Sequence, residues 1–83
     1  MSIESRVQET VEFVLAVHHQ FDSIDIHTPL TGDPLRIEDF ELVYIVMELM
    51  ERFGVSFEAS DFENYKFNTI SGIIDAVKRH LDE

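Results

Sequence analysis

Hydrophobic residues recur every three or four positions over the first part of the chain. Ser2 precedes this pattern and is a residue type that caps helix N-termini. Because such a repeat places side chains on one side of an α-helix, we expect an amphipathic helix from Ile3 to about His19. Phe13 and Leu15 lie off the stripe and would widen it. The stripe consists of Ile3, Val7, Val11, Val14 and Val17.

The repeat breaks between Phe21 and Glu38, where turn-forming residues are frequent. Both prolines of the chain fall in this segment, and a residue that precedes proline avoids the helical conformation. We expect a long loop of roughly 15–18 residues, a length that is uncommon in compact domains and is often functional. Four apolar residues would hold the loop against the core, namely Ile24, Ile26, Leu30 and Leu35.

The segment from Asp39 to Phe53 carries the strongest helical pattern, and Gly54 follows it as a C-cap residue. It has two apolar faces. A helix that is apolar around so much of its circumference either lies centrally or shows an apolar strip to a partner. One face consists of Leu42, Val46, Leu49 and Phe53, and the other consists of Phe40, Val43, Tyr44, Met47 and Met50.

The rest of the chain predicts a short helix or turn, from Phe57 to Phe67, and a last helix from about Ile70 to Leu81 that Thr69 caps. No segment alternates with a period of two. We therefore expect an all-α fold with three sizeable helices, one short helix and a long first loop, in one domain that spans residues 1–83. The inner face of the last helix is expected at Ile70, Ile73, Ile74, Val77 and Leu81.

The chain is strongly acidic, with 17 Asp and Glu against 6 Lys and Arg and a net charge of −11. Nucleic acids and anionic lipids attract basic proteins, so we expect no nucleic-acid partner and no membrane partner. Either the charge suits a partner with a basic surface, or it only keeps a small domain soluble. Since there is no cysteine, no signal-like start and no long apolar run, we expect a cytoplasmic protein, and we expect a monomer.

Groups that would support catalysis or metal binding are few. The sequence offers no nucleophile paired with a base and no phosphate-binding loop, so we do not expect an enzyme. His18 and His19 are adjacent, and adjacent side chains diverge on a helix. The segment from Asp22 to Asp25 lacks the glycine and the final glutamate of a calcium loop. We therefore expect no metal site.

Four landmarks occur in the order found in one known family. Leu35 stands four residues before Asp39, and residues 43–50 read Val-Tyr-Ile-Val-Met-Glu-Leu-Met. Residues 51–55 read Glu-Arg-Phe-Gly-Val, and Asn-Thr-Ile at 68–70 is followed by Ile-Ile-Asp at 73–75. Together these landmarks resemble acyl carrier proteins. The resemblance implies the four-helix bundle of that family.

The resemblance places Asp39 at the position of the serine that carries phosphopantetheine in acyl carrier proteins. Glu38 and Phe40 align with the outer residues of the family's Asp-Ser-Leu triplet, and Arg36 replaces the usual glycine. A serine oxygen forms a stable phosphodiester, whereas the Asp39 carboxylate would form a mixed anhydride that hydrolyses readily. We expect no cofactor on the chain as it stands, and phosphopantetheine if Asp39 were serine.

Three interpretations of Asp39 stay open. Its carboxylate could offer partners the charge of a modified serine without the arm. It could merely cap the helix, since aspartate is favourable at a helix N-terminus. It could also be a serine-to-aspartate change in an ordinary phosphopantetheine-dependent acyl carrier protein.

In acyl carrier proteins this helix docks onto basic grooves of partner enzymes, and the resemblance implies the same here. The expected function is an acyl-carrier-like protein of a fatty acid, polyketide or peptide-modifying pathway that docks on a synthase, transferase or modifying enzyme. The spacing of Glu41, Glu48 and Glu51 places these three acids on one side of the helix. The alternative is an ordinary solvated face, with some methionines in the core. The predicted docking residues are Glu38, Phe40, Glu41, Val43, Tyr44, Met47, Glu48, Met50 and Glu51.

Overall fold

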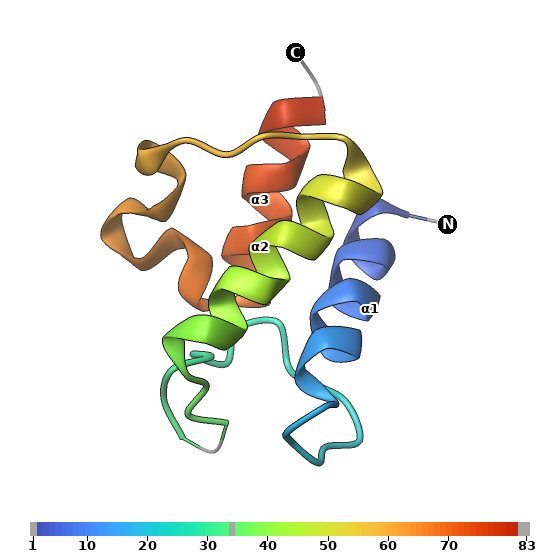
Figure 1. The fold of residues 1–83 in the computed structure, drawn as a ribbon, viewed down its shortest axis with the longest axis vertical. Coiled ribbons are helices and arrows are strands. Elements are labelled where there is room, and N and C mark those ends of the chain that lie inside the picture. The colour runs from blue at the N-terminus through green and yellow to red at the C-terminus, as the bar shows by residue number, and fades with distance from the viewer. Residues whose placement is uncertain (1, 34, 82–83) are drawn as a thin grey trace.

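The computed structural model describes residues 2–33 and 35–81, except for the side chains of residues 64–66. Three α-helices and one 3-10 helix make up the fold: α1 (Ile3–Leu15), α2 (Asp39–Phe53), η1 (Ala59–Asn68) and α3 (Ile70–Leu81). The described residues contain no strand, so the all-α prediction is confirmed. In Figure 1, α1 packs against both α2 and α3, and η1 packs against α3.

Helix α1 begins as predicted but ends four residues early. The Ser2 side chain accepts a hydrogen bond from the backbone N–H of Ser5, which caps the first turn. At the other end, the backbone N–H groups of His18 and His19 both donate to the carbonyl of Leu15, so the chain turns away there. The prediction that Val17 belongs to the buried stripe and Leu15 lies beside it is wrong. Leu15 is fully buried, and Val17 is exposed.

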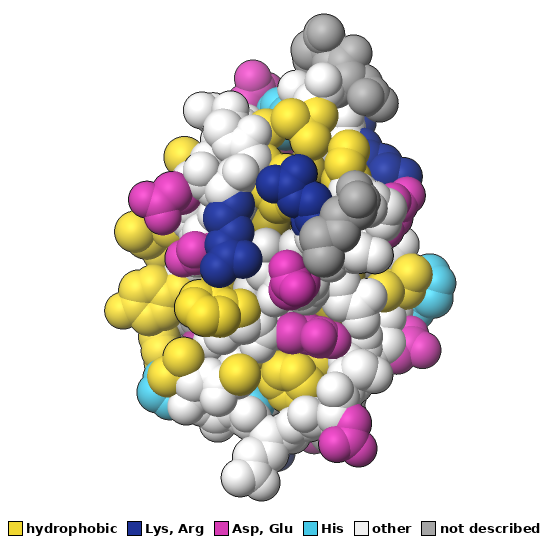
Figure 2. Space-filling model, turned by 90° about the vertical axis from the view of Figure 1, so that its right-hand side faces the viewer, with side chains coloured by type: hydrophobic (Ala, Val, Ile, Leu, Met, Phe, Trp, Pro, Cys, Tyr) yellow, Lys and Arg dark blue, Asp and Glu magenta, His cyan; other side chains and the backbone are white. Residues whose placement is uncertain are grey.

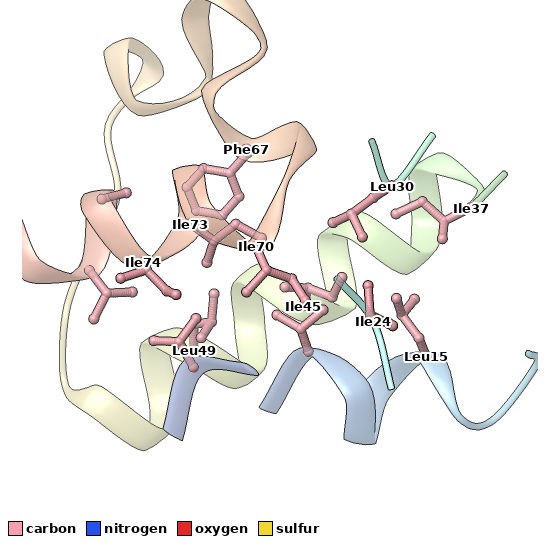
Figure 3. Close-up of a cluster of buried hydrophobic side chains, with 14 of the residues drawn as sticks. Leu15, Ile24, Leu30, Ile37, Ile45, Leu49, Phe67, Ile70, Ile73 and Ile74 are labelled. Carbon is pink, nitrogen blue, oxygen red and sulfur yellow. The ribbon is translucent and has the colours of Figure 1, made fainter. Parts of the chain in front are cut away.

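The long connection between α1 and α2 is held against the core by apolar side chains. Ile24, Leu30 and Leu35 are buried as predicted, and Ile37 is buried as well. Figure 3 shows Ile24, Leu30 and Ile37 on the same side of the cluster as Leu15. Backbone hydrogen bonds from Leu30 to the carbonyl of Asn68, and from Ser71 to the carbonyl of Ile26, also fix the loop to the start of α3. Because of these bonds, the loop fixes where α2 begins.

Helix α2 turns Ile45 and Leu49 into the centre of the core, where both are fully buried. The buried side of the helix therefore does not coincide with either predicted face, although it includes Leu49 of the first. Leu42, Val46 and Phe53 are only partly buried, whereas Ile45 was assigned to neither face. Gly54 ends the helix with a positive φ of 67°, which suits the predicted C-cap residue because glycine has no Cβ to clash.

Helix α3 and η1 form the other side of the core. The Thr69 hydroxyl accepts a hydrogen bond from the N–H of Gly72, so its predicted capping role is confirmed. Leu81 is an exception to the predicted inner face, because it lies in the last turn and is 40% exposed. The other members of that face are buried: Ile70, Ile73, Ile74 and Val77. No helix in the described part of the chain has the length and apolar character needed to cross a membrane.

Candidate functional site

Asp39 is the first residue of α2, and its side chain is exposed. The N-cap residue is Glu38, whose backbone N–H donates to the side chain of Glu41 at 2.8 Å. Among the described side chains, which leave out those of residues 64–66, no hydrogen bond or ion pair involves the Asp39 carboxylate. Glu38, not Asp39, is therefore the capping residue, and the interpretation of Asp39 as the cap is wrong; Asp39 still lies in the first turn, where its charge complements the helix dipole, and its side chain is exposed.

Glu41 does not belong to an exposed acidic row, contrary to the prediction. It is only 2% exposed. Besides capping Glu38, it lies 2.8 Å from Nε2 of His19, which follows the turn after α1. A buried carboxylate must be hydrogen-bonded, and these two contacts satisfy it. Glu41 therefore holds the N-terminus of α2 against the turn that follows α1.

The two other acids of the predicted row differ from each other. Glu48 is half-buried and accepts a hydrogen bond from Nε of Arg52 at 3.0 Å, one turn later on the helix. Glu51 is exposed. The exposed acids of this region are therefore near the two ends of α2, with Glu38, the N-cap residue of the capping box, and Asp39 at one end and Glu51 at the other. The expectation that residues 41, 48 and 51 share one solvent-facing side is wrong.

The second apolar face of α2 lies at the surface. These side chains are between 38% and 58% exposed, which is unusual for large apolar residues that are neighbours on one helix. Phe40 packs edge-on against Tyr44, with ring centroids 6.0 Å apart. The exposed strip consists of Phe40, Val43, Tyr44, Met47 and Met50. Whether it binds a partner stays a prediction.

An apolar pocket of about 350 Å³ borders Asp39 on the side of η1. Val43, Val46 and Met47 of α2 line one wall, and Phe62 of η1 contributes to the other. The described lining is almost wholly apolar, so the pocket suits an apolar group; among the described side chains, Asp39 at its border is the only acid, base or nucleophile that lines it. The described residues hold no group of three or more His, Asp or Glu side chains that could bind a metal.

A second groove, of about 250 Å³, lies on the opposite side of the strip, between α2 and the end of α1. Tyr44 and Met47 form its α2 wall, and the other wall consists of Phe13 of α1 and of Val17 and His18 in the turn that follows. The sequence analysis missed this groove because it assigned Val17 to the core. The available signal was Phe13, a large apolar residue off the buried stripe of α1.

Neither protein-family models nor curated protein sequences give a match for this chain. The function is therefore inferred from the residues and their geometry.

Proposed function

We propose that this chain is an acyl-carrier-like protein that docks on partner enzymes through α2 and carries no phosphopantetheine at Asp39. The observation that carries this proposal is the apolar strip at the surface of α2, which has exposed acids at both ends and begins beside Asp39. A strip with this composition suits a partner with an apolar centre and basic flanks, in a synthase, transferase or modifying enzyme.

The backbone at Arg36 supports the resemblance on which the proposal depends. Arg36 has a φ of 49°, a left-handed conformation that glycine adopts at little cost and other residues adopt rarely. The alignment with acyl carrier proteins places their usual glycine at this position. The chain order of α1, long loop, α2, η1 and α3 also suits the four-helix arrangement of that family, which we include in the proposal.

The chemistry of a carboxylate argues against a covalent role for Asp39. Attack of a carboxylate oxygen on the pyrophosphate of coenzyme A would release 3′,5′-adenosine diphosphate and leave an acyl phosphate, which water cleaves. The carboxylate already carries one negative charge at the place where a phosphodiester would carry one. Asp39 thus keeps the charge of a modified carrier without the arm.

An ordinary carrier with a serine-to-aspartate change at position 39 is the second candidate. The apolar pocket that borders Asp39 favours it, because an apolar cargo on an arm attached there could enter the pocket. Both candidates share the scaffold and differ in whether the arm belongs to the protein's natural state.

Incubation with coenzyme A and a promiscuous phosphopantetheinyl transferase, followed by intact-mass measurement, tests the proposal. We expect no mass gain for the wild-type chain and a gain of one phosphopantetheine arm for Asp39→Ser. A stable gain on the wild type would contradict the loss of the covalent role. Failure of Asp39→Ser to accept the arm, with its helical content intact, would contradict the carrier-like scaffold.

Docking is tested in the same reaction with second substitutions in the Asp39→Ser background. Val43→Lys places a positive charge in the exposed strip, and we expect the transfer rate to fall at least tenfold. Leu81→Lys changes the net charge equally at an exposed apolar position in the last turn of α3, and we expect a rate within twofold of Asp39→Ser alone. Equal rates for the two double variants would exclude the strip as the docking surface for this enzyme.

A further inference from the structure

We propose that the groove between α1 and α2 receives an amphipathic helix of a basic partner, in addition to the contact that the outer strip of α2 makes. The groove is open and mostly apolar; one wall comes from α1 and the turn after it, and the other comes from α2. Figure 2, which views the molecule from the side of α1, shows hydrophobic side chains gathered along the left edge of that face. Phe13 of α1 and Val17 in the turn after it are 60% and 73% exposed, although both are large apolar residues.

The spacing of the exposed residues matches a helix as the occupant. On one wall, Phe13 lies in the last turns of α1 and Val17 in the turn that follows it. On the other wall, Tyr44 and Met47 are three residues apart along α2, and Phe40, four residues before Tyr44, extends this row beside His18, with ring centroids 5.9 Å apart. The row on α2 is about 10 Å long, since each helical residue rises 1.5 Å. A partner helix of two to three turns, with apolar residues at such intervals, would fill the space between the rows.

The charge around the groove selects a basic helix. Exposed Glu9 lies one turn before Phe13 on α1, and exposed Glu51 lies one turn after Met47 on α2. Glu41 and Glu48 are among the described residues that line the groove, and no Lys or Arg is. Arg52 lies beside it: its guanidinium is 4.9 Å from the centre of the Phe13 ring, and Glu48 already pairs with it. Lys and Arg flanking the apolar face of a partner helix would therefore meet uncompensated acids at this end.

A second copy of this chain is the other possible occupant, and its charge disfavours it. Two copies would bring together two net charges of −11. The exposed large apolar residues of α1 and α2 together present roughly 600–700 Å², if each is about half exposed and has a full area near 200 Å². That area approaches the roughly 800 Å² that each partner buries in a standard interface, so the exposed area alone would permit a dimer. The repulsion between the two net charges is the reason that we favour a basic helix over a second copy.

The charge argument rests on the proposed function, because both assume a basic partner, but the groove itself does not. The test therefore uses a defined probe. It is a helical peptide of about 16 residues made of Ala and Lys, with three leucines at positions i, i+4 and i+7. A control peptide has the same composition with its leucines spread around the helix. Fluorescence anisotropy gives the affinity, and amide chemical shifts in NMR spectra locate the contact.

We expect the amphipathic peptide to bind at least tenfold more tightly than the control and to shift amides near Phe13–His18 and Tyr44–Glu48. Val17→Lys should weaken binding at least tenfold, because it places a like charge in the groove. Leu81→Lys, with the same change in net charge outside the groove, should stay within twofold of the wild type. Val43→Lys, on the outer strip, should also stay within twofold, which separates the groove from the docking strip.

Equal affinity of the two peptides would overturn the proposal, since binding would then depend on charge alone. Loss of binding for Val43→Lys without loss for Val17→Lys would also overturn it and assign the peptide to the outer strip. A dimer in sedimentation equilibrium whose contact shifts map to the groove would assign the groove to a second copy. The transferase assay with Asp39→Ser is independent of these results, so the proposed function can fail or hold separately.

Discussion

Two acids near the start of α2 differ in role although only one residue separates them. Asp39 is exposed, whereas Glu41 is almost fully buried between the N-terminus of α2 and His19. Both residue types are expected in the first turn of a helix, where they complement the dipole. What separates them is His19, which comes from a distant part of the chain. A substitution at each position should therefore affect a different property of the protein.

Glu41→Ala should lower the free energy of unfolding by about 2–3 kcal/mol, because it leaves the N–H of Glu38 and the His19 ring without their partner. Glu41→Gln keeps an oxygen acceptor and should cost about half as much. Urea unfolding followed by circular dichroism gives these values. The control Glu51→Ala, at an exposed position of the same helix, should change stability by less than about 0.5 kcal/mol. Equal costs at the two positions would contradict the burial of Glu41.

Arg36→Gly should stabilise the protein, because the positive φ of 49° strains any residue with a Cβ. The gain should be about 0.5–1 kcal/mol once the greater flexibility of glycine in the unfolded chain is subtracted. The control Arg36→Ala removes the exposed contact with Asp33 but keeps the strain, and it should be close to neutral. A stability of Arg36→Gly at or below that of Arg36→Ala in urea unfolding would contradict this account.

At the scale of elements, η1 is fixed to α3 mainly by one buried acid and a group of rings. Asp61 caps the backbone N–H of Glu58 at 2.7 Å and also contacts His80 at 2.9 Å and Arg79 at 3.1 Å. The Phe57 ring packs edge-on against His80 and Phe67, with centroids 5.4 Å and 5.1 Å away. These contacts hold the wall of the apolar pocket that η1 contributes.

The pH dependence of stability should report this attachment. Burial raises the pKa of Asp61, but the Glu58 N–H, His80 and Arg79 outweigh it and hold the pKa below its ordinary value of 3.8. Because the pKa of this carboxyl is lower in the folded state, the unfolded chain binds more protons than the folded chain as the pH falls. The stability that Asp61 contributes is therefore fully present at a pH above its ordinary pKa, and it is lost as the pH falls through the lower pKa of the folded state.

The difference in unfolding free energy between wild type and Asp61→Asn should be about 1–2 kcal/mol near neutral pH. It should change little above about pH 5 and shrink by about pH 3. Urea unfolding across this range measures it. The control Asp75→Asn, at an exposed position of α3, should have nearly the same unfolding free energy as wild type at every pH in this range. A difference that grows towards acid pH would show that Asp61 is not stabilised in its charged form.

At the scale of the whole molecule, the net charge of −11 should destabilise the folded state through self-repulsion. Added NaCl screens such repulsion, so the urea midpoint should rise between about 0.02 M and 0.5 M salt. Glu9→Lys with Glu51→Lys adds two charge units at each site and gives a net charge of −7 (−11 + 4). This double variant should show a smaller rise. An equal rise in both proteins would attribute the salt effect to something other than net charge.

Much of the fold could be predicted from local patterns. The all-α class, the cap at Thr69, the C-cap at Gly54 and the buried loop residues Ile24 and Leu30 follow from spacing and turn chemistry, and the structure agrees. The end of α1 was wrong by four residues because a period of three to four cannot show where a helix stops. That error also placed Val17 in the core.

For the candidate site, the sequence by itself determined which residues of α2 are apolar or acidic, and placed Asp39 at the start of the helix. Helical periodicity carries that information, since it depends only on neighbours along the chain. Only the tertiary structure decided that Glu41 is buried, that Ile45 is central and that Phe13 and Val17 form a groove with Tyr44 and Met47. Burial and groove formation depend on what another helix or loop covers, which no local pattern records.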